Sequence, residues 1–212
     1  SVPQERNEVT AMANLITLSR LILLAIVVIL LYSGGPVVKL IAFVLTILII
    51  VMDGIDGIVA RARGEVSELG AVMDIAIDRV VENIYWIVYA DLNLVPIWVA
   101  LVVVSRGIIT DAIRGFVLAR GDTAFGMMKT PWARWLVSGR PMRAFYGAIK
   151  AVVFAALALY MALREWRPDA PWLDPLAGLL FVLVLITVAT TVLRGVPVVL
   201  ESRRYFFAEP ID

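Results

Sequence analysis

The segment DGIDGIVARARGEVSELGAVMDIAID, from Asp53 to Asp78, carries four aspartates between two long apolar runs. A carboxylate inside a membrane helix is costly, and it is retained mainly where it faces water and has a cationic partner. Four carboxylates in one short stretch therefore indicate a bound metal ion.

The spacing of these aspartates makes the prediction more specific. Asp53 and Asp56 are three residues apart, and Asp74 and Asp78 are four apart, so each pair shares one helix face. Two such helices side by side direct all four carboxylates at one point. An all-oxygen cluster suits Mg²⁺, Mn²⁺ or Ca²⁺, and two such ions can lie about 3.5–4 Å apart. Softer metals are disfavoured because the chain has no Cys and no His. The alternative, helix caps and helix-end charges, would explain Asp53 or Glu65 singly but not the whole set.

Composition indicates a membrane protein. Of the 212 residues, 61% are hydrophobic and 17% charged, and the mean hydropathy is +0.91. A soluble core of this size cannot hide so much apolar surface. The net charge of +1 says little about partners. No basic patch predicts nucleic-acid binding, and no low-complexity tract or soluble domain interrupts the chain.

Six stretches of about 20 mostly apolar residues predict an all-α, polytopic protein with six transmembrane helices. They are residues 15–32, 37–60, 69–90, 95–118, 144–163 and 176–200. We expect one transmembrane domain over residues 1–212, in which residues 1–13 form a cytoplasmic arm or a short interfacial helix.

The distribution of basic residues predicts the orientation, because cytoplasmic segments carry an excess of Lys and Arg. The richer side holds Arg6, Arg61, Arg63, Arg120, Lys129, Arg134, Arg140, Arg143, Arg203 and Arg204, against Lys39, Arg164 and Arg167 on the other. The aspartates are then expected at the cytoplasmic ends of the second and third helices. In a prokaryote this membrane would be the inner or plasma membrane.

The aspartate segment resembles the signature of the CDP-alcohol phosphotransferases, integral membrane enzymes of phospholipid synthesis. Every fixed position is filled, in the pattern Asp53-x2-Asp56-Gly57-x2-Ala60-Arg61-x8-Gly70-x3-Asp74-x3-Asp78. The resemblance implies transfer of a phosphatidyl-type group from a CDP-lipid, CDP-diacylglycerol, to the hydroxyl of a small polar alcohol, with release of CMP. It also implies two divalent cations, Mg²⁺ or Mn²⁺, and suggests a homodimer.

The resemblance assigns roles residue by residue. Asp53, Asp56 and Asp74 are expected metal ligands, and Asp78 is a ligand or the base that takes the acceptor's hydroxyl proton. A carboxylate between two cations is a weak base, so the base role requires looser metal binding at Asp78. The CDP pocket is expected to be lined by Gly57, Ala60, Arg61 and Gly70. Close helix packing is the alternative reason for the two glycines.

A second likeness lies in the first span. Residues 14–20, NLITLSR, resemble the N-L-x-T-x-x-R segment of phosphatidylglycerophosphate synthases. Asn14 and Thr17 are therefore nucleotide-site candidates, although Asn14 is as well suited to cap a helix.

The expected acceptor carries a phosphate. Arg106, Thr110 and Arg114 recur every four residues and form one polar stripe in the fourth span. With Lys129 and Arg134 in the next segment, these arginines favour an anion, since Arg binds phosphate through paired N–H donors. The alternative pairs Arg114 with Asp111 and leaves the loop cations to anionic lipid headgroups.

Glycerol 3-phosphate is the favoured acceptor, because residues 105–109 and the sequence GMMKT at 126–130 resemble phosphatidylglycerophosphate synthases. Those enzymes usually have an acidic residue where Gly107 stands. The Asp78-Arg79 pair is closer to the branch of the family that uses inositol phosphate. Inositol phosphate is therefore the alternative acceptor. A divalent-cation transporter is a remote alternative, because its carboxylates would be spread along a pore rather than gathered at one side.

Overall fold

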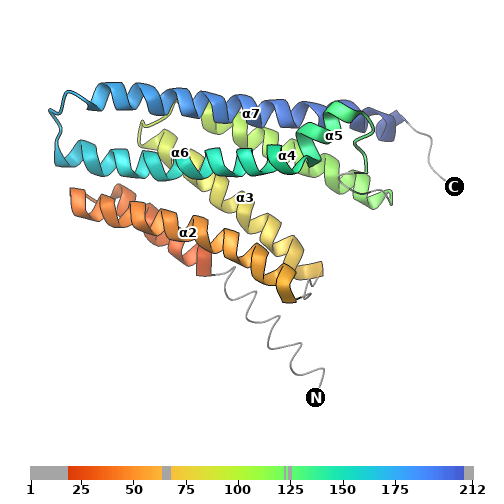
Figure 1. The fold of residues 1–212 in the computed structure, drawn as a ribbon, viewed down its shortest axis with the longest axis horizontal. Coiled ribbons are helices and arrows are strands. Elements are labelled where there is room, and N and C mark those ends of the chain that lie inside the picture. The colour runs from red at the N-terminus through yellow and green to blue at the C-terminus, as the bar shows by residue number, and fades with distance from the viewer. Residues whose placement is uncertain (1–18, 64–67, 122, 124–125, 208–212) are drawn as a thin grey trace, which may run out of the picture. The chain divides into compact units, whose positions relative to one another are not determined.

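The computed structural model describes residues 19–63, 68–121, 123 and 126–207, and within these ranges every regular element is a helix. The first helix, Ser19–Tyr32, precedes six others along the chain (Figure 1). These are α2 (Pro36–Arg63), α3 (Glu68–Asp91), α4 (Ile97–Ala119), α5 (Pro131–Ser138), α6 (Arg140–Trp166) and α7 (Leu173–Phe207). The predicted all-α fold is confirmed.

Five of the predicted spans correspond to α2, α3, α4, α6 and α7, and the helix Ser19–Tyr32 falls inside the first. Among the described residues, three helical segments are long and apolar enough to cross a membrane, namely Pro36–Gly54, Arg140–Trp166 and Leu173–Phe206. The other helices of similar length, α3 and α4, carry charged side chains within their apolar runs. The count of six spans therefore stays a prediction.

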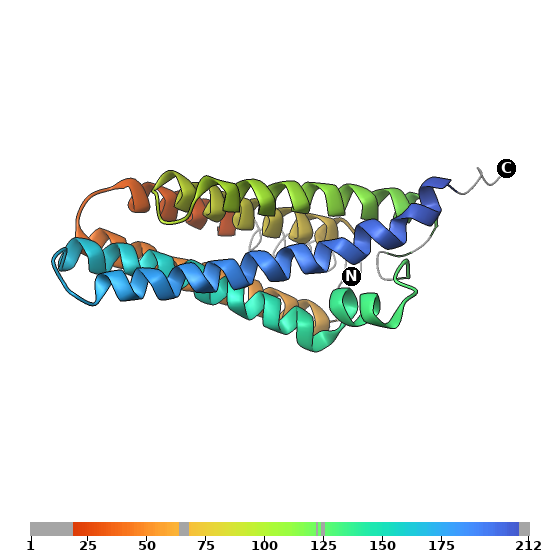
Figure 2. The same cartoon turned by 90° about the horizontal axis from the view of Figure 1, so that it is seen from above.

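The short helix α5 was not predicted. It lies in the connection between α4 and α6 (Figure 2). Its first residue is Pro131, and proline is well suited to this position because the first N–H groups of a helix make no hydrogen bond within the helix. Ala133 and Val137, one turn apart, are buried, whereas Trp132 and Trp135 are exposed. At eight residues the helix is too short for a periodic pattern to stand out from the surrounding loop.

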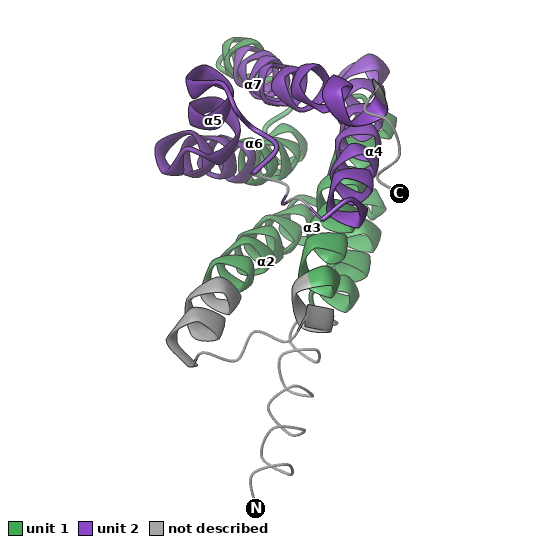
Figure 3. Cartoon of the chain, turned by 90° about the vertical axis from the view of Figure 1, so that its right-hand side faces the viewer, with its two compact units in different colours: residues 1–94, 153–180 green, residues 95–152, 181–212 purple. Residues whose placement is uncertain are grey.

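The chain divides into two compact units (Figure 3). Unit 1 comprises Ser1–Leu94 and Val153–Leu180, and unit 2 comprises Val95–Val152 and Phe181–Asp212. Each unit is built around its own buried side chains.

The core of unit 1 is aromatic. Tyr85, Trp86 and Tyr89 share one face of α3 and surround Phe154 of α6, with the Tyr85 and Phe154 rings stacked at 4.9 Å between centroids. Each tyrosine hydroxyl in this core has a partner. Tyr85 donates to Thr46 Oγ1 of α2 at 3.0 Å, and Tyr89 donates to the Phe154 carbonyl at 2.7 Å. These bonds join three helices and satisfy polar atoms that would otherwise be costly to bury.

The end of the helix Ser19–Tyr32 is fixed by polar contacts in unit 1. Lys39 of α2 donates to the Leu31 carbonyl and lies 3.6 Å from Glu165 of α6, while the Tyr32 hydroxyl donates to Asp91 of α3. The end of the first helix is thus tied directly to α2 and α3, and Lys39 extends this contact to α6.

Unit 2 is held together around α5 and the second half of α7. Its buried apolar cluster comprises Ile113, Val117, Met127, Met128, Ala133, Val137 and Val198. Arg194 of α7 donates to the carbonyls of Leu136 and Val137 at 3.0 and 3.2 Å, so a buried guanidinium closes the end of α5. These carbonyls have no partner further along α5, because the helix stops at Ser138.

The aromatic core gives a stability prediction. Tyr89→Phe removes the buried hydrogen bond to the Phe154 carbonyl while keeping the ring. We expect it to lower the free energy of unfolding in detergent by ~1 kcal/mol, the usual net value of such a bond. Tyr160→Phe is the matched control, since it removes a phenolic hydroxyl from α6 without affecting that bond. Equal stability of the Tyr89→Phe variant and the parent protein would contradict this account of the core.

Candidate functional site

Three signature aspartates converge in unit 1. Asp53 lies in α2, while Asp74 and Asp78 lie one turn apart in α3. One carboxylate oxygen from each lies within 4.8 Å of the other two. The three side chains are 46–48% exposed, so they are open to a ligand from outside.

A single arginine joins these carboxylates. Arg20, in the first turn of the helix Ser19–Tyr32, has its Nη2 at 2.8 Å from Asp53 Oδ1 and 2.9 Å from Asp78 Oδ1, and its Nη1 at 3.6 Å from Asp74 Oδ1. The Arg20 side chain is only 2% exposed. Arg20 is the last residue of the N-L-x-T-x-x-R segment, but the sequence pattern predicted no role for it. The available signal was a lone charge at the start of an apolar run.

Several predicted site residues lie where the structure describes no side chain. Asp56, Gly57, Ala60 and Arg61 belong to α2 and Gly70 to α3, but the positions of their side chains lie outside the description. Asn14 and Thr17 lie outside the described residues altogether. The fourth aspartate and the CDP pocket therefore stay predictions.

The donor set fits a hard divalent cation. Carboxylate oxygens are the ligands that Mg²⁺ and Mn²⁺ prefer, and oxygens on opposite sides of one Mg²⁺ are about 4 Å apart. The observed separation of up to 4.8 Å is close to this value. The carboxylates also surround a point at which they already bind one cationic group, the Arg20 guanidinium. Asp53, Asp74 and Asp78 are the described residues that could hold the metal.

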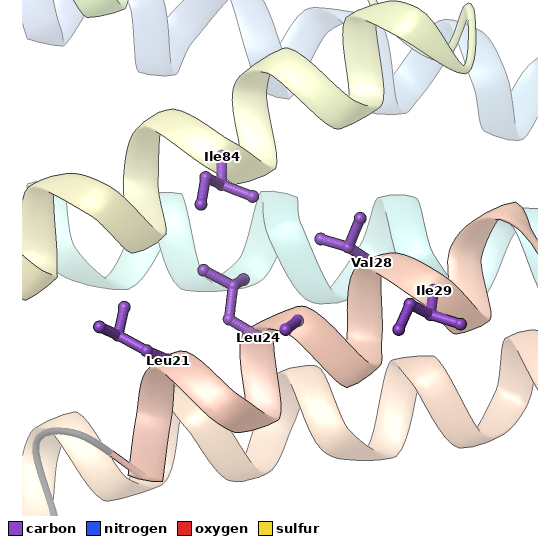
Figure 4. A pocket seen from close by; sticks show the side chains of 6 residues that line it. Leu21, Leu24, Val28, Ile29 and Ile84 are labelled. Atoms are coloured by element: carbon purple, nitrogen blue, oxygen red, sulfur yellow. The ribbon is translucent and has the colours of Figure 1, made fainter.

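An apolar pocket of about 470 Å³ lies between the helix Ser19–Tyr32 and α3. It is lined by Leu21, Leu24, Ala25, Val28, Ile29 and Ile84 (Figure 4). Leu21 directly follows Arg20, and Ile84 lies six residues after Asp78 on α3, so the pocket extends along the two helices that carry the charged groups. Its lining is almost entirely apolar.

Unit 2 contains a second concentration of charge, in which arginines predominate. Arg106 of α4 packs across Gly195 of α7, where an added Cβ would lie 3.0 Å from Arg106 Nε and 3.1 Å from its Cγ. Glycine at this position therefore makes room for the arginine side chain. The polar stripe predicted on α4 does place Arg106 against another helix.

Arg194, next to that glycine, is a site candidate that sequence reasoning missed. It is 8% exposed and lies over the Tyr146 ring at 5.2 Å, and like-charge repulsion from Arg106, Arg114 and Arg143 acts on it. Lys150 approaches the same ring at 4.6 Å. The signal in the sequence was an arginine in an apolar run, three and four residues after two threonines.

The remaining predicted acceptor residues lie in three different surroundings. Arg114 lies 3.6 Å from Asp111, so the pairing considered as an alternative does form. Arg134 lies on α5 and lines a separate pocket with Pro131, Trp135, Ser138 and Gly139, and the Lys129 side chain is exposed.

The segment that carries Lys129 is anchored by a carboxylate. Glu201 of α7 accepts hydrogen bonds from the backbone N–H groups of Lys129 and Thr130 at 3.4 and 3.2 Å and from the Thr130 hydroxyl at 2.5 Å. Arg204 donates to the Met127 carbonyl in the same segment. The end of α7 thus fixes the backbone that leads into α5.

Comparison with known proteins identifies the class to which these features belong. Residues 10–200 match the CDP-alcohol phosphatidyltransferase family, and the chain belongs to it. A Mycobacterium tuberculosis protein named "Probable phosphatidylglycerophosphate synthase" is 27% identical over 119 residues, which is 55% of this chain and 57% of that protein. A Bacillus subtilis protein named CDP-diacylglycerol–glycerol-3-phosphate 3-phosphatidyltransferase is 27% identical over 166 residues, which is 70% of this chain and 86% of that protein. The match thus spans little more than half of the mycobacterial relative.

The Glu201 contacts give a prediction that does not depend on the chemistry. Glu201→Gln removes the negative charge from three hydrogen bonds, and charge-assisted bonds are roughly twice as strong as neutral ones. We expect hydrogen exchange at the amides of Lys129 and Thr130 to become about tenfold faster, which corresponds to a loss of about 1.4 kcal/mol in local opening free energy. Thr130→Val is the matched variant, because it removes only the hydroxyl bond. Unchanged exchange in Glu201→Gln would show that the segment is held by other contacts.

Proposed function

We propose that this chain transfers a phosphatidyl group from CDP-diacylglycerol to the hydroxyl of a small phosphorylated alcohol, glycerol 3-phosphate, and releases CMP. The observation that carries the proposal is the convergence of Asp53, Asp74 and Asp78 on one cation position in a chain of this family. The Bacillus subtilis relative is named for glycerol 3-phosphate as its acceptor, and the mycobacterial relative for phosphatidylglycerophosphate as its product; both names support glycerol 3-phosphate as the acceptor here.

The proposed setting is a bilayer that the chain crosses six times as one domain, with the aspartates at the cytoplasmic ends of α2 and α3. Three helices of sufficient length and apolar character support this arrangement. The basic excess on one side supports the orientation. A homodimer is part of the proposal because the family likeness suggests one.

The chemistry follows from charge. When bound at the aspartates, two Mg²⁺ or Mn²⁺ ions neutralise the diphosphate of the donor and the charge that develops on CMP. Asp53, Asp56 and Asp74 serve as ligands, and Asp78 serves as a fourth, more loosely bound ligand. Asp78 takes the proton of the acceptor hydroxyl, whose oxygen then forms a bond to the phosphorus as the bond to the CMP oxygen breaks. Gly57, Ala60, Arg61 and Gly70, together with Asn14 and Thr17, line the CDP pocket.

The donor's lipid part has a matching surface. A CDP-lipid whose diphosphate lies at the aspartates would place an acyl chain along the apolar pocket beside Leu21, Leu24 and Ile84. We propose this pocket as the site of one chain of the donor.

The acceptor's phosphate is proposed to bind in unit 2, at Arg106 and Arg194. Several positive side chains acting on one buried guanidinium are unfavourable unless an anion joins them, and phosphate accepts the paired donors of arginine well. Arg114, Lys129 and Arg134 are the further residues that the sequence pattern proposes for acceptor binding.

Loss of a ligand should abolish catalysis. Asn at Asp53, Asp56 or Asp74 keeps the side-chain shape but removes a negative charge from the metal site, so each variant should lose at least about a hundredfold in kcat. CMP release from CDP-diacylglycerol by purified protein measures this. EDTA should stop turnover, and Mg²⁺ or Mn²⁺ should restore it. Near-normal activity in Asp56→Asn would disprove the assignment of the fourth ligand.

The acceptor site can be tested with two variants, one that keeps the charge of Arg106 and one that removes it. Gly195→Ala introduces a Cβ against the Arg106 side chain and must displace it by a few tenths of an ångström. We expect the KM for glycerol 3-phosphate to rise several-fold, while Arg106→Ala should raise it by the equivalent of about 2–4 kcal/mol. The KM for CDP-diacylglycerol should stay near that of the parent protein in both variants. Gly178→Ala is the matched control, because an added Cβ there meets no atom within 4 Å.

The choice of acceptor is decided by measuring CMP release with glycerol 3-phosphate, inositol phosphate, inositol and serine under the same conditions. Preference for inositol phosphate would keep the phosphate site and change the substrate. Preference for serine or unphosphorylated inositol would show that Arg106 and Arg194 serve the structure alone.

A further inference from the structure

The contact that neither the family signature nor the proposed mechanism uses is the ion-pair cluster of Arg20. Its guanidinium lies at 2.8–2.9 Å from two of the proposed metal ligands and at 3.6 Å from a third. At these distances the guanidinium occupies the position that a metal ion bound by the same carboxylates would take. Arg20 and bound metal therefore compete for the same carboxylate oxygens.

Arg20 also has donors to spare. Its Nε and Nη1 are buried and have no hydrogen-bond partner among the described residues. A buried guanidinium N–H without an acceptor is unfavourable, and such groups in native proteins usually meet a ligand or water. Because the side chain is 2% exposed and tied to the carboxylates, an acceptor for these two N–H groups would have to reach them at this site.

The donor brings the required acceptor. A diphosphate has several anionic oxygens, and the planar fork of arginine binds such groups through two N–H donors at once. Divalent cations that take over Asp53 and Asp78 would free the Nη2 of Arg20 at the moment when the diphosphate arrives beside it. The helix Ser19–Tyr32 keeps the guanidinium at this position, since its far end is tied to Lys39 and Asp91.

We propose that Arg20 is an exchangeable counter-ion. It neutralises the aspartates while the metal site is empty, and it passes to the donor's diphosphate when the divalent cations bind. One guanidinium then couples the binding of metal to the binding of the CDP-lipid and positions the diphosphate for attack. This inference rests on the proposed function, because it takes the aspartates as metal ligands and a CDP-lipid as the donor.

The first test measures Mn²⁺ binding to the purified protein in detergent without donor, by titration calorimetry or by the electron paramagnetic resonance of free Mn²⁺. Arg20→Met removes the competing cation, so the Kd for Mn²⁺ should fall at least about tenfold. Arg79→Met is the matched control, since it removes a positive charge one residue after Asp78 from a side chain paired with Glu82. A weaker or unchanged Mn²⁺ affinity in Arg20→Met would overturn the proposal and make Arg20 a fixed brace.

The second test measures binding of CDP-diacylglycerol with saturating Mn²⁺ present. Arg20→Met should weaken it at least about tenfold, because the diphosphate loses its arginine. Arg20→Lys should tighten Mn²⁺ less than Arg20→Met and restore donor binding only in part, because a point charge cannot reproduce the paired donors. This variant also tests the proposal if Arg20→Met does not fold. Donor affinity equal to that of the parent protein in both variants would exclude the exchange.

The failure of this inference is distinguishable from the failure of the proposed function. Asp74→Asn should weaken Mn²⁺ binding if the aspartates form the metal site at all. If it does so while Arg20→Met changes nothing, only the role of Arg20 is wrong. If Asp74→Asn leaves Mn²⁺ binding intact, the metal site itself is misplaced.

Discussion

The free-energy cost of burying charge in an apolar chain is the constraint on which the rest of this structure depends. In unit 1 the three described aspartates tolerate one another because a buried guanidinium lies among them. In unit 2 the arginines are tolerated because Arg194 donates to two carbonyls at the end of α5 and lies over the face of Tyr146. Each unit therefore carries excess charge of one sign, negative in one and positive in the other, and each would gain stability from a ligand of the opposite sign.

The apolar framework holds these charges at fixed positions. Tyr85 and Tyr89 fix α3 against α2 and α6 through hydrogen bonds inside an aromatic cluster. Lys39 ties the start of α2 to the end of the first helix. With both of its neighbours fixed, that helix keeps the backbone of Arg20 beside the aspartates, so an exchange of partners needs movement of the side chain alone.

Much of this could be predicted from the sequence, because apolar runs and carboxylate spacing are local signals. Apart from the end of α7, which lies seven residues past the expected bound, the helix ends fall within about four residues of the predicted spans. The four-residue spacing of Asp74 and Asp78 on α3 does bring both carboxylates to Asp53 of α2, whereas the place of Asp56 stays a prediction. The roles of Arg20 and Arg194 could not be predicted, because they depend on residues 33 to 58 positions away in the chain. The helix α5 escaped notice since eight residues give too little periodicity. For Arg114, the neighbouring Asp111 was recognised in advance as a possible partner, and the ion pair forms.

The anchoring of α5 by the end of α7 has a consequence for how the protein can be modified. The apolar run of α7 ends near Leu200, but Glu201 and Arg204 beyond it hold the backbone at residues 127–130, and the Tyr205 carbonyl accepts a bond from Arg120. The stretch from Glu201 to Tyr205 is therefore part of the folded structure of unit 2. Fusion partners, labels or tethers joined to the chain directly after its last apolar turn would disturb the basic segment, whereas an attachment point after Phe207 leaves every one of these bonds in place.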